Sequence, residues 1–356
     1  MSAPASLQKS PVVLVAGHIC LDLHPTLAEL PVLDPGHLVE VGPLELAPGG
    51  CVANTGGDLV ALGVPVSVAA DVGEDILGRI LADLLRERGL DAAGLSRRPS
   101  TTSYSVVVQA PGVDRIFWHH VGANCDFDGQ DLRFGSERVL HVGYPSLLPA
   151  LVARDGAPFR DLLARARADG LATSVDFAVV DAPTPASRTR WSAILATCVP
   201  FMDVLTPSID DLDSMTGLSG EAGDPLAAAG RLVRGGAAIA LVTAGPRGVA
   251  LATADADRFA LAGEVVASLG ADWHSRALRV SPVAVASPVT TTGAGDAATA
   301  GFLAALLDRC TPEAAVQRAV ETAAAKIAGS ALAPLPAVSP AGPPAGPPAG
   351  LASPPG

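Results

Sequence analysis

The segment TTTGAGDAATAGF, residues 290–302, joins three threonines, a Gly-Ala-Gly turn, one carboxylate at Asp296 and the start of an apolar helix. Glycines let an anion approach the backbone closely, and the N–H groups and dipole at a helix N-terminus attract phosphate. An Asp in that first turn could take the proton from a hydroxyl that attacks phosphorus. The same residues also fit a glycine turn in which Asp296 only favours the start of a buried helix. The segment therefore predicts either a phosphoryl-transfer site or a simple turn before a helix.

Two common phosphate-binding loops do not explain this segment. A Walker A loop requires Gly-Lys, and the sequence contains no Gly-Lys pair. Residues 293–298 fit the dinucleotide pattern G-x-G-x-x-A, but that pattern also needs a following strand with an acidic residue about 20 positions on. The sequence instead predicts two helices, 296–309 and 312–328, and then a Pro-rich tail. These features disfavour a dinucleotide-dependent dehydrogenase.

The rest of the chain alternates short apolar segments with amphipathic ones. The run VVLVA at 12–16 ends in Gly17, as a buried strand often does. Strands that alternate with helices form βαβ units, so we expect an α/β fold with a doubly wound, mostly parallel sheet and helices on both faces. Further strands are expected at 66–70, 104–109, 115–118, 138–142, 172–176, 203–206, 238–243 and 282–286, and further helices at 75–88, 158–169, 186–198 and 224–235.

Two segments, 38–50 and 101–121, are rich in strand and turn residues. Pro111-Gly112 lies near the middle of the second, which is typical of a hairpin turn. We expect both segments to form a small β-lid beside the main sheet. The chain is then one domain over 11–330 with a disordered Pro/Gly/Ala-rich tail at 333–356.

Composition excludes several kinds of partner. The chain of 356 residues carries a formal net charge of −12 and has no clustered basic stripe, so we expect no nucleic-acid partner. No apolar run approaches the roughly 18 residues of a membrane helix, so we expect no membrane partner. The five cysteines are scattered and form no C-x-x-C, which indicates neither a zinc site nor a disulfide framework. A reducing, cytoplasmic location fits this cysteine usage.

The opening segment resembles the phosphate-loop signature D-T-x-G-A-G-D of the ribokinase-like (PfkB-type) carbohydrate kinases. Four more segments resemble that family in its own order, so the resemblance covers roughly residues 12–330. It implies an enzyme that uses ATP and Mg²⁺ to phosphorylate a hydroxyl of a small sugar or polyol. The four segments are GHICLD (17–22), PGGCVANTGGDLVALG (48–63), DVGEDILGRILADLL (71–85) and LVTAGPRGVAL (241–251).

The resemblance assigns roles on the phosphate side. Asp296 is implied to be the catalytic base, and the amides of Gly293, Ala294 and Gly295 are implied to form the anion hole for the transferred group. The residues implied to bind the nucleotide are Thr243, Gly245, Gly248 and Thr292.

The resemblance also assigns residues on the acceptor side. Asp22 is expected just past the first strand, at its carboxyl edge, where it could accept hydrogen bonds from sugar hydroxyls. Gly49, Gly50 and Asn54 match family substrate contacts. Two alternatives remain: Asp22 as a solvated loop residue, and Asn54 as the cap of a short helix at 54–62.

Three positions depart from the family pattern. In TPSIDD (206–211), Ser208 and Asp211 replace the Asn and Glu of a magnesium-associated motif, so Asp211 is expected to contact Mg²⁺ through water. Thr290 replaces the leading Asp of the signature, which puts activation by a monovalent cation in doubt. Cys51 replaces the Lys usual in ribokinases, which argues against ribose as the substrate.

The sequence therefore predicts a sugar or polyol kinase, with two alternatives. One is a nucleoside kinase of the same fold, for which Tyr104, Phe117 and Trp118 near the lid could stack on a base. The other is a non-catalytic homologue that senses a ligand. Arg115 in the lid could clamp a phosphate. The resemblance also implies a homodimer formed through the β-lid.

Overall fold

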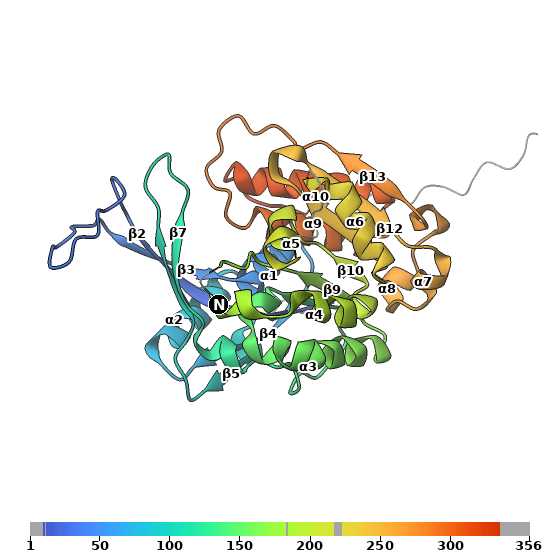
Figure 1. Ribbon diagram of the computed structural model, residues 1–356, viewed down its shortest axis with the longest axis horizontal. Helices are drawn as coiled ribbons and strands as arrows, with labels where there is room; N and C mark the ends of the chain where they lie inside the picture. Colours follow the sequence, from blue (N-terminus) through green and yellow to red (C-terminus); the bar gives the residue numbers. More distant parts are fainter. Residues whose placement is uncertain (1–9, 11, 183, 217–222, 335–356) are drawn as a thin grey trace, which may run out of the picture.

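The computed structural model describes residues 10, 12–182, 184–216 and 223–334 of the chain. Within them, the main sheet has nine strands in the order β13-β12-β11-β10-β9-β8-β1-β4-β5 (Figure 1). Neighbouring strands run parallel except for β11–β12 and β12–β13, which are antiparallel. The expected doubly wound, mostly parallel sheet is confirmed. The strands are β1 (Val13–Gly17), β4 (Val66–Gly73), β5 (Leu95–Arg98), β8 (Val139–Gly143), β9 (Ala172–Asp176), β10 (Val204–Leu205), β11 (Ile239–Thr243), β12 (Val249–Thr253) and β13 (Ala277–Val280).

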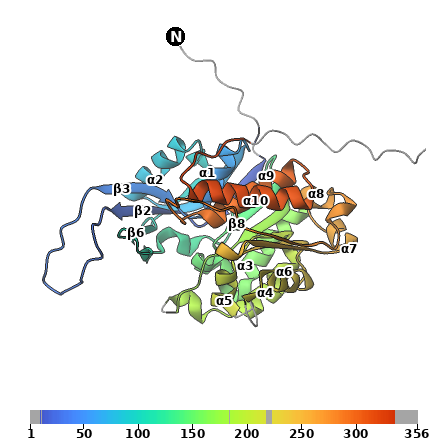
Figure 2. The ribbon, with the colours of Figure 1, turned by 90° about the horizontal axis from the view of Figure 1, so that it is seen from above.

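Helices cover both faces of this sheet because its buried strands are apolar on both sides. In β1, Val13 and Val15 pack under one set of helices, whereas Leu14 and Ala16 pack under the other. Figure 2 shows the two helical layers with the sheet between them. One layer holds α1 (Cys51–Ala61), α2 (Ile76–Glu87), α9 (Ala294–Leu307) and α10 (Pro312–Ile327), and the other holds α3 (Pro149–Ala168), α4 (Trp191–Cys198), α5 (Ile209–Thr216) and α6 (Pro225–Arg234).

A second sheet of four strands projects from one side of the molecule (Figures 1 and 2). Its order is β3-β2-β6-β7, with β2 (Cys20–Pro25), β3 (Leu44–Gly49), β6 (Tyr104–Val108) and β7 (Ile116–His120). The hairpin expected at 101–121 is present as β6 and β7, and Gly112 in its loop has φ 75°. We call these four strands the β-lid. The sequence did not predict β2, which pairs with both β3 and β6.

The strand expected at 282–286 is wrong. The edge strand β13 ends at Val280, which pairs with Val249, the first residue of β12. Residues beyond 280 therefore have no ladder partner on β12, and Pro282 could not donate to one. The chain instead crosses from β13 to α9 as an irregular segment.

The ends of α10 are close to those predicted. Thr311 caps it by accepting a hydrogen bond from the N–H of Ala314, and Pro312 is its first residue. None of the described helices is both long and apolar enough to span a bilayer. Of the tail predicted at 333–356, only residues 333 and 334 lie within the described residues.

Candidate active site

Asp296 lies in the first turn of α9, on a helix start that Gly293 forms in the left-handed conformation with φ 73°. The Asp296 side chain is 2% exposed. Its Oδ1 accepts a hydrogen bond from Thr55 Oγ1 at 2.8 Å, and its Oδ2 accepts from Tyr144 Oη at 2.6 Å and from Asn54 Nδ2 at 3.3 Å. Since a carboxylate has about four acceptor directions, room for one further partner remains.

Burial raises the pKa of Asp296 above its ordinary value. The hydrogen bonds from Tyr144, Thr55 and Asn54 act in the opposite direction because they stabilise the anion. The result is a fixed carboxylate that holds a proton more tightly than an exposed Asp does. Such a group is suited to receive a proton near neutral pH.

The loop before α9 packs closely around Asp296. A Cβ added to Gly293 would lie 3.3 Å from Lys326 Cε, 3.8 Å from Asp296 Oδ2 and 3.9 Å from Asn54 Cγ. A Cβ added to Gly295 would meet no atom within 4 Å, so the backbone there borders open space. The N–H of Ala294 makes a long bond of 3.3 Å to Thr291 O, which engages one of the three predicted anion-hole donors. The N–H of Thr292 donates to Thr290 Oγ1.

Helix α1 supplies polar groups to this site from one of its faces. Asn54 and Thr55 reach Asp296, and Asp58, one turn later, binds Lys326 Nζ at 2.8 Å. Because α1 begins at Cys51, Asn54 lies inside the helix, and the alternative that it caps a helix at 54–62 is wrong. Thr55 and Asp58 were missed. The i, i+4 spacing of Asn54 and Asp58 in an otherwise apolar helix could have indicated this polar face.

Tyr144 was also missed. It follows β8 directly and has φ 59°, which is rare for a non-glycine residue. Its N–H donates to Asp176 O, so the backbone holds this conformation while the hydroxyl reaches Asp296. Backbone strain of this kind is concentrated at functional sites.

Two more carboxylates are buried: Asp176, the last residue of β9, and Asp211, in the first turn of α5. Asp211 Oδ2 accepts from Ser208 N at 2.7 Å, and Ser208 Oγ accepts from Asp211 N at 3.1 Å. These reciprocal bonds form a capping box at the start of α5. Burial, with the charges of Asp210 and Asp296, raises the pKa of Asp211 to about 6. Burial and the charge of Asp211 raise the pKa of Asp176 as well.

The described residues contain no group of three or more His, Cys, Asp or Glu side chains placed to hold a metal ion. Mg²⁺ usually keeps several waters and is bound by one or two carboxylates together with substrate phosphates. Asp211 therefore fits a water-mediated contact to Mg²⁺ that is carried mainly by nucleotide phosphates.

On the acceptor side, Asp22 lies in β2 of the β-lid, paired with Ala47, so its expected place at the edge of the first strand is corrected. The reason is the additional strand, which turns residues 20–25 into the second sheet. Gly49 is next to it: a Cβ there would lie 2.1 Å from Asp22 Oδ2. Gly50 has φ 82°, and a Cβ there would lie 2.6 Å from His18 O. Both positions need glycine, and the structure brings them together with Asp22.

The predicted nucleotide residues lie at the turn between β11 and β12. Thr243 forms a bridge with Ser208, while Gly245 and Gly248, with φ 52° and 83°, shape the turn. An open groove of about 530 Å³ lies between residues 283–287 and α10. Its lining includes Val283, Val285, Ala324 and Ala328, and none of these was singled out from the sequence.

The loop between β6 and β7 contacts the predicted phosphate loop through Arg115, whose Nη1 donates to Thr291 Oγ1 at 2.7 Å. The same guanidinium pairs with the neighbouring Asp114. This contact joins the tip of the lid to the segment just before Gly293.

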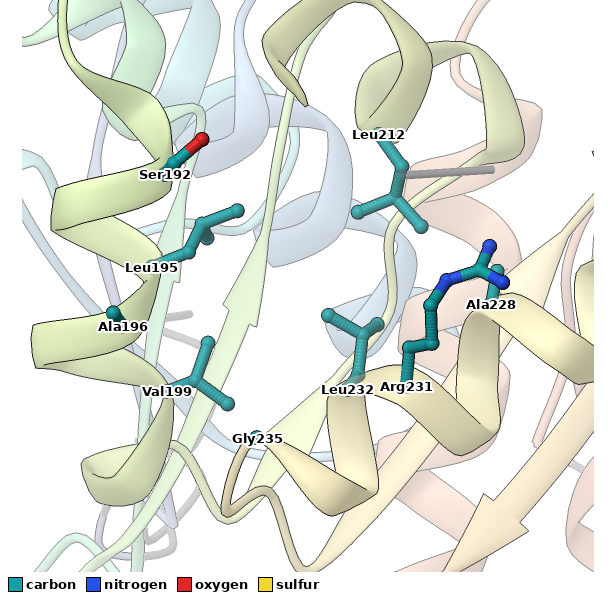
Figure 3. A pocket seen from close by; sticks show the side chains of 9 residues that line it. All are labelled: Ser192, Leu195, Ala196, Val199, Leu212, Ala228, Arg231, Leu232 and Gly235. Atoms are coloured by element: carbon teal, nitrogen blue, oxygen red, sulfur yellow. The ribbon is translucent and has the colours of Figure 1, made fainter. Parts of the chain in front are cut away.

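A smaller cavity of about 200 Å³ lies elsewhere, among α4, α5 and α6 (Figure 3). It is lined mainly by apolar side chains such as Leu195, Leu212 and Leu232. These helices belong to the layer on the other face of the sheet from α9, and the cavity contains none of the predicted site residues.

Solved structures with this arrangement show that the fold is ribokinase-like. One is Arabidopsis thaliana ribokinase complexed with ribose and ATP, with a TM-score of 0.66 and 19% identity over 90% of this chain and 93% of that one. Another is a putative ribokinase II from E. coli in complex with ATP and Mg²⁺, with a TM-score of 0.67 and 20% identity over 89% of this chain and 93% of that one.

The sequence model of the pfkB family carbohydrate kinases matches residues 11–337, so the chain belongs to this family. A fructokinase of Rhizobium leguminosarum bv. trifolii is 26% identical over 72% of this chain and 71% of the relative. The probable chloroplastic fructokinase-6 of Arabidopsis thaliana is 27% identical over 42% of this chain, and that match spans 38% of the relative's length. The family and these relatives support a phosphotransferase that acts on a sugar hydroxyl.

Proposed function

We propose that the protein transfers the γ-phosphoryl group of ATP to a hydroxyl of a small sugar or polyol. The observation that carries this proposal is the buried Asp296 carboxylate, which three side chains hold at a glycine-opened helix start. The family membership supports the same chemistry.

In the proposed reaction, the acceptor hydroxyl oxygen attacks the γ-phosphorus while Asp296 takes the hydroxyl proton. A new P–O bond forms to the acceptor. The bond between the γ-phosphorus and the bridging oxygen breaks, and ADP leaves with that electron pair. Tyr144 and Thr55 orient the carboxylate so that the proton has a fixed destination.

The helix start provides the charge stabilisation. Amides of Gly293, Ala294 and Gly295 are proposed to form the anion hole, and the open space beside Gly295 leaves room for the transferred group. Lys326 adds a cation whose Cε lies close to Gly293. Transfer of a phosphoryl group depends mainly on positioning and electrostatics. The amides and the lysine cation are the kinds of group that this chemistry requires.

The nucleotide is proposed to lie along the turn that holds Thr243, Gly245 and Gly248, with Thr292 beside its phosphates. The groove between residues 283–287 and α10 supports this, because its apolar lining suits a planar base. Two fold neighbours were solved with ATP, one of them also with Mg²⁺. When bound, Mg²⁺ would neutralise phosphate charge, with Asp211 contacting it through water. The hydroxyl oxygen of Thr290 already accepts a hydrogen bond from the N–H of Thr292. Because Thr290 also offers no carboxylate to a monovalent cation, we expect no requirement for one.

The acceptor is proposed to lie between the β-lid and α1, in contact with Asp22, Gly49, Gly50 and Asn54. The Asp22 carboxylate is next to Gly49, and Asn54, five residues further along the chain, donates to Asp296, so a short stretch of chain connects the proposed acceptor residues with the proposed base. An ATP-using enzyme with free cysteines fits a cytoplasmic location.

The β-lid is also the proposed surface for a homodimer. Ile116, Phe117 and Trp118 of β7 and Leu44 of β3 are each about half exposed, between 47% and 57%. Apolar side chains gathered on one sheet often mark an interface. Sedimentation of the full chain at micromolar concentration tests this directly, and a monomer under those conditions would reject it.

The function is tested by ADP release from the full-length protein with Mg·ATP and a panel of acceptors. The panel holds fructose, ribose, sorbitol, glycerol, adenosine and uridine. A sugar or polyol should give the highest kcat/KM. Preference for a nucleoside would replace the proposal with a nucleoside kinase, and acceptor binding without turnover would replace it with a ligand-sensing homologue.

A further inference from the structure

Two imidazoles, one buried at His18 and one partly buried at His119, lie between the acceptor residues and Asp296, and the reaction described above does not use them. The ring of His18 is 5.3 Å from that of His119 and 5.9 Å from that of Tyr144. Tyr144 donates to Asp296, so His18 is one aromatic ring away from the proposed base. His18 follows β1, whereas His119 belongs to the β-lid strand β7.

His18 is 3% exposed, and neither Nδ1 nor Nε2 has a hydrogen-bond partner among the described residues. A buried polar atom without a partner costs roughly 1–3 kcal/mol. The backbone of His18 is fixed, because its N–H donates to Gly143 O and its carbonyl accepts from Val52 N. Gly50 leaves space for the ring, since a Cβ there would lie 2.7 Å from Nδ1. The His18 side chain is therefore held in a fixed place while both of its ring nitrogens lack hydrogen-bond partners among the described residues, which suits it to bind a ligand.

His119 connects this place to Asp22. Its Nδ1 shares a hydrogen bond of 3.0 Å with Ser105 Oγ, while its Nε2 is buried without a partner among the described residues. Ser105 Oγ in turn contacts Cys20 Sγ at 3.9 Å, and Cys20 Sγ donates to Asp22 Oδ1 at 3.2 Å. A continuous chain of side chains therefore links the lid imidazole to the proposed acceptor carboxylate.

We propose that His18 and His119 form a subsite that binds hydroxyls of an uncharged polyhydroxy acceptor, other than the hydroxyl that is phosphorylated. This inference rests on the proposed function and names the acceptor class. A neutral imidazole offers one donor and one acceptor, and so does a hydroxyl, so each unpartnered nitrogen can be satisfied by the ligand. His18 belongs to the body and His119 to the lid, so an acceptor that bridges them also joins the lid to the body.

The surroundings favour an uncharged ligand. Asp22 and Asp296 flank the imidazoles, and an anionic acceptor would be repelled by both carboxylates. Burial, and for His18 the neighbouring His119, lowers the pKa of both imidazoles, so they do not supply a compensating positive charge near neutral pH. The rings of His18, His119 and Tyr144 are tilted by 53° and 32°, which does not form a flat slot for a nucleobase.

Binding is tested first without ATP, by NMR of the full-length protein labelled with ¹⁵N in histidine. Fructose, ribose, sorbitol and adenosine are added separately at millimolar concentration. The ring nitrogen signals of His18 and His119, assigned with His18→Gln and His119→Gln, should shift with at least one sugar or polyol. The signals of His120 should not, because adjacent strand residues face opposite ways. If no sugar or polyol shifts either signal, the proposal is wrong, whether or not the protein has kinase activity.

Kinetics provide the second test once an acceptor is phosphorylated. His18→Gln and His119→Gln should raise the acceptor KM at least about tenfold, as the loss of one ligand hydrogen bond does, while the KM for ATP stays within about twofold. His120→Gln is the matched control on the same strand and should leave both constants unchanged. A deoxy acceptor that lacks the hydroxyl bound by one histidine should bind the wild type more weakly than the parent acceptor does. In the variant that lacks this histidine, the difference between the two acceptors should be much smaller.

Each result has a distinct meaning. Equal losses in the KM for ATP and for the acceptor indicate a general structural role and overturn the subsite. Failure of the proposed function appears differently, as absent ADP release with every acceptor or as a preference for a nucleoside, while the histidine signals still shift with a sugar or polyol.

Discussion

The proposed phosphate side and the proposed acceptor side of the candidate site are built in different ways. Asp296, Gly293 and Gly295 come from one continuous stretch at the start of α9. Asp22, Gly49 and His119 come from three strands of the β-lid that are brought together only by sheet pairing. The phosphate side is a local structure, because the conformation of one helix start sets its geometry. The acceptor side depends on the β-lid, so acceptor choice can change without altering the phosphoryl chemistry.

The largest expected effect is on the phosphate side. Asp296→Asn keeps the shape and can still accept from Thr55, but it cannot take a proton. We expect kcat to fall at least about a hundredfold, because general-base help is worth that much. The measurement is ADP release with the best acceptor at saturating Mg·ATP.

Asp308→Asn is the control for this change, since Asp308 is an exposed carboxylate at the other end of α9. It should leave kcat unchanged. A kcat for Asp296→Asn within about threefold of wild type would show that the base assignment is wrong, because the expected loss is far larger.

On the acceptor side, Gly49→Ala should have the next largest effect. The added Cβ would lie 2.1 Å from Asp22 Oδ2, so the carboxylate must move from its place. We expect the acceptor KM to rise between about tenfold and a hundredfold, a loss of roughly 1.4–2.7 kcal/mol of binding, with kcat less affected.

Gly57→Ala is the matched control for Gly49→Ala, because a Cβ at Gly57 meets only Arg88 Cδ at an ordinary 3.7 Å. It should leave both constants near those of the wild type. If Gly49→Ala lowers kcat and leaves the acceptor KM unchanged, Asp22 does not bind the acceptor.

The same contrast explains what the sequence could predict. The glycine turn, Asp296 and the doubly wound sheet follow from local patterns, and so does the hairpin of β6 and β7. The strand expected at 282–286 failed because pairing with β12 ends at Val280, a limit that no local pattern reveals. β2 was missed for the same reason, since its paired residues are 19–29 positions away on β3 and 83 positions away on β6.

Several site residues were hidden because their roles depend on distant partners. Tyr144 and Asp296 are 152 residues apart, and Lys326 and Asp58 are 268 apart. A tyrosine after a strand or a lysine near a helix end has no distinctive spacing. These residues lie near the candidate base only because the end of β8, α1, α9 and α10 pack together.

Arg115→Ala should weaken the contact between the acceptor side and the phosphate side. This removes the bond from the β-lid to Thr291 in the phosphate loop. We expect kcat/KM for the acceptor to fall about tenfold, because one charged hydrogen bond is worth roughly 1.5–3 kcal/mol and part of it is screened. The measurement is the full rate profile against acceptor concentration.

Arg86→Ala is the control for Arg115→Ala, since Arg86 forms an exposed pair with Asp83 within α2. It should change nothing measurable. A normal kcat/KM for Arg115→Ala would mean that the lid and the phosphate loop act independently.

The smallest effect on turnover is expected from Asp211→Asn, because the proposed magnesium contact is through water. Its clearer consequence is on stability. The folded-state pKa of Asp211 is about 6, above the ordinary 3.8, so the folded protein binds this proton more tightly than the unfolded chain. This contribution to stability is complete below pH 3.8 and is lost as the pH rises through 6.

Asparagine at 211 stays neutral and can still accept from Ser208 N, so it avoids that loss. Relative to wild type, Asp211→Asn should therefore gain up to about 3 kcal/mol between pH 4 and pH 7.5, shared with Asp176 and Asp296 because the three carboxyls titrate together. Thermal unfolding midpoints at the two pH values measure this. Asp210→Asn removes the charge of an exposed neighbour on α5, which is only one of the causes that raise the pKa of Asp211, so it should show a much smaller gain. An equal pH response in both variants would show that Asp211 is not one of the coupled buried carboxyl groups. Asp296 and Asp176 alone would then account for the titration of the proposed phosphate side.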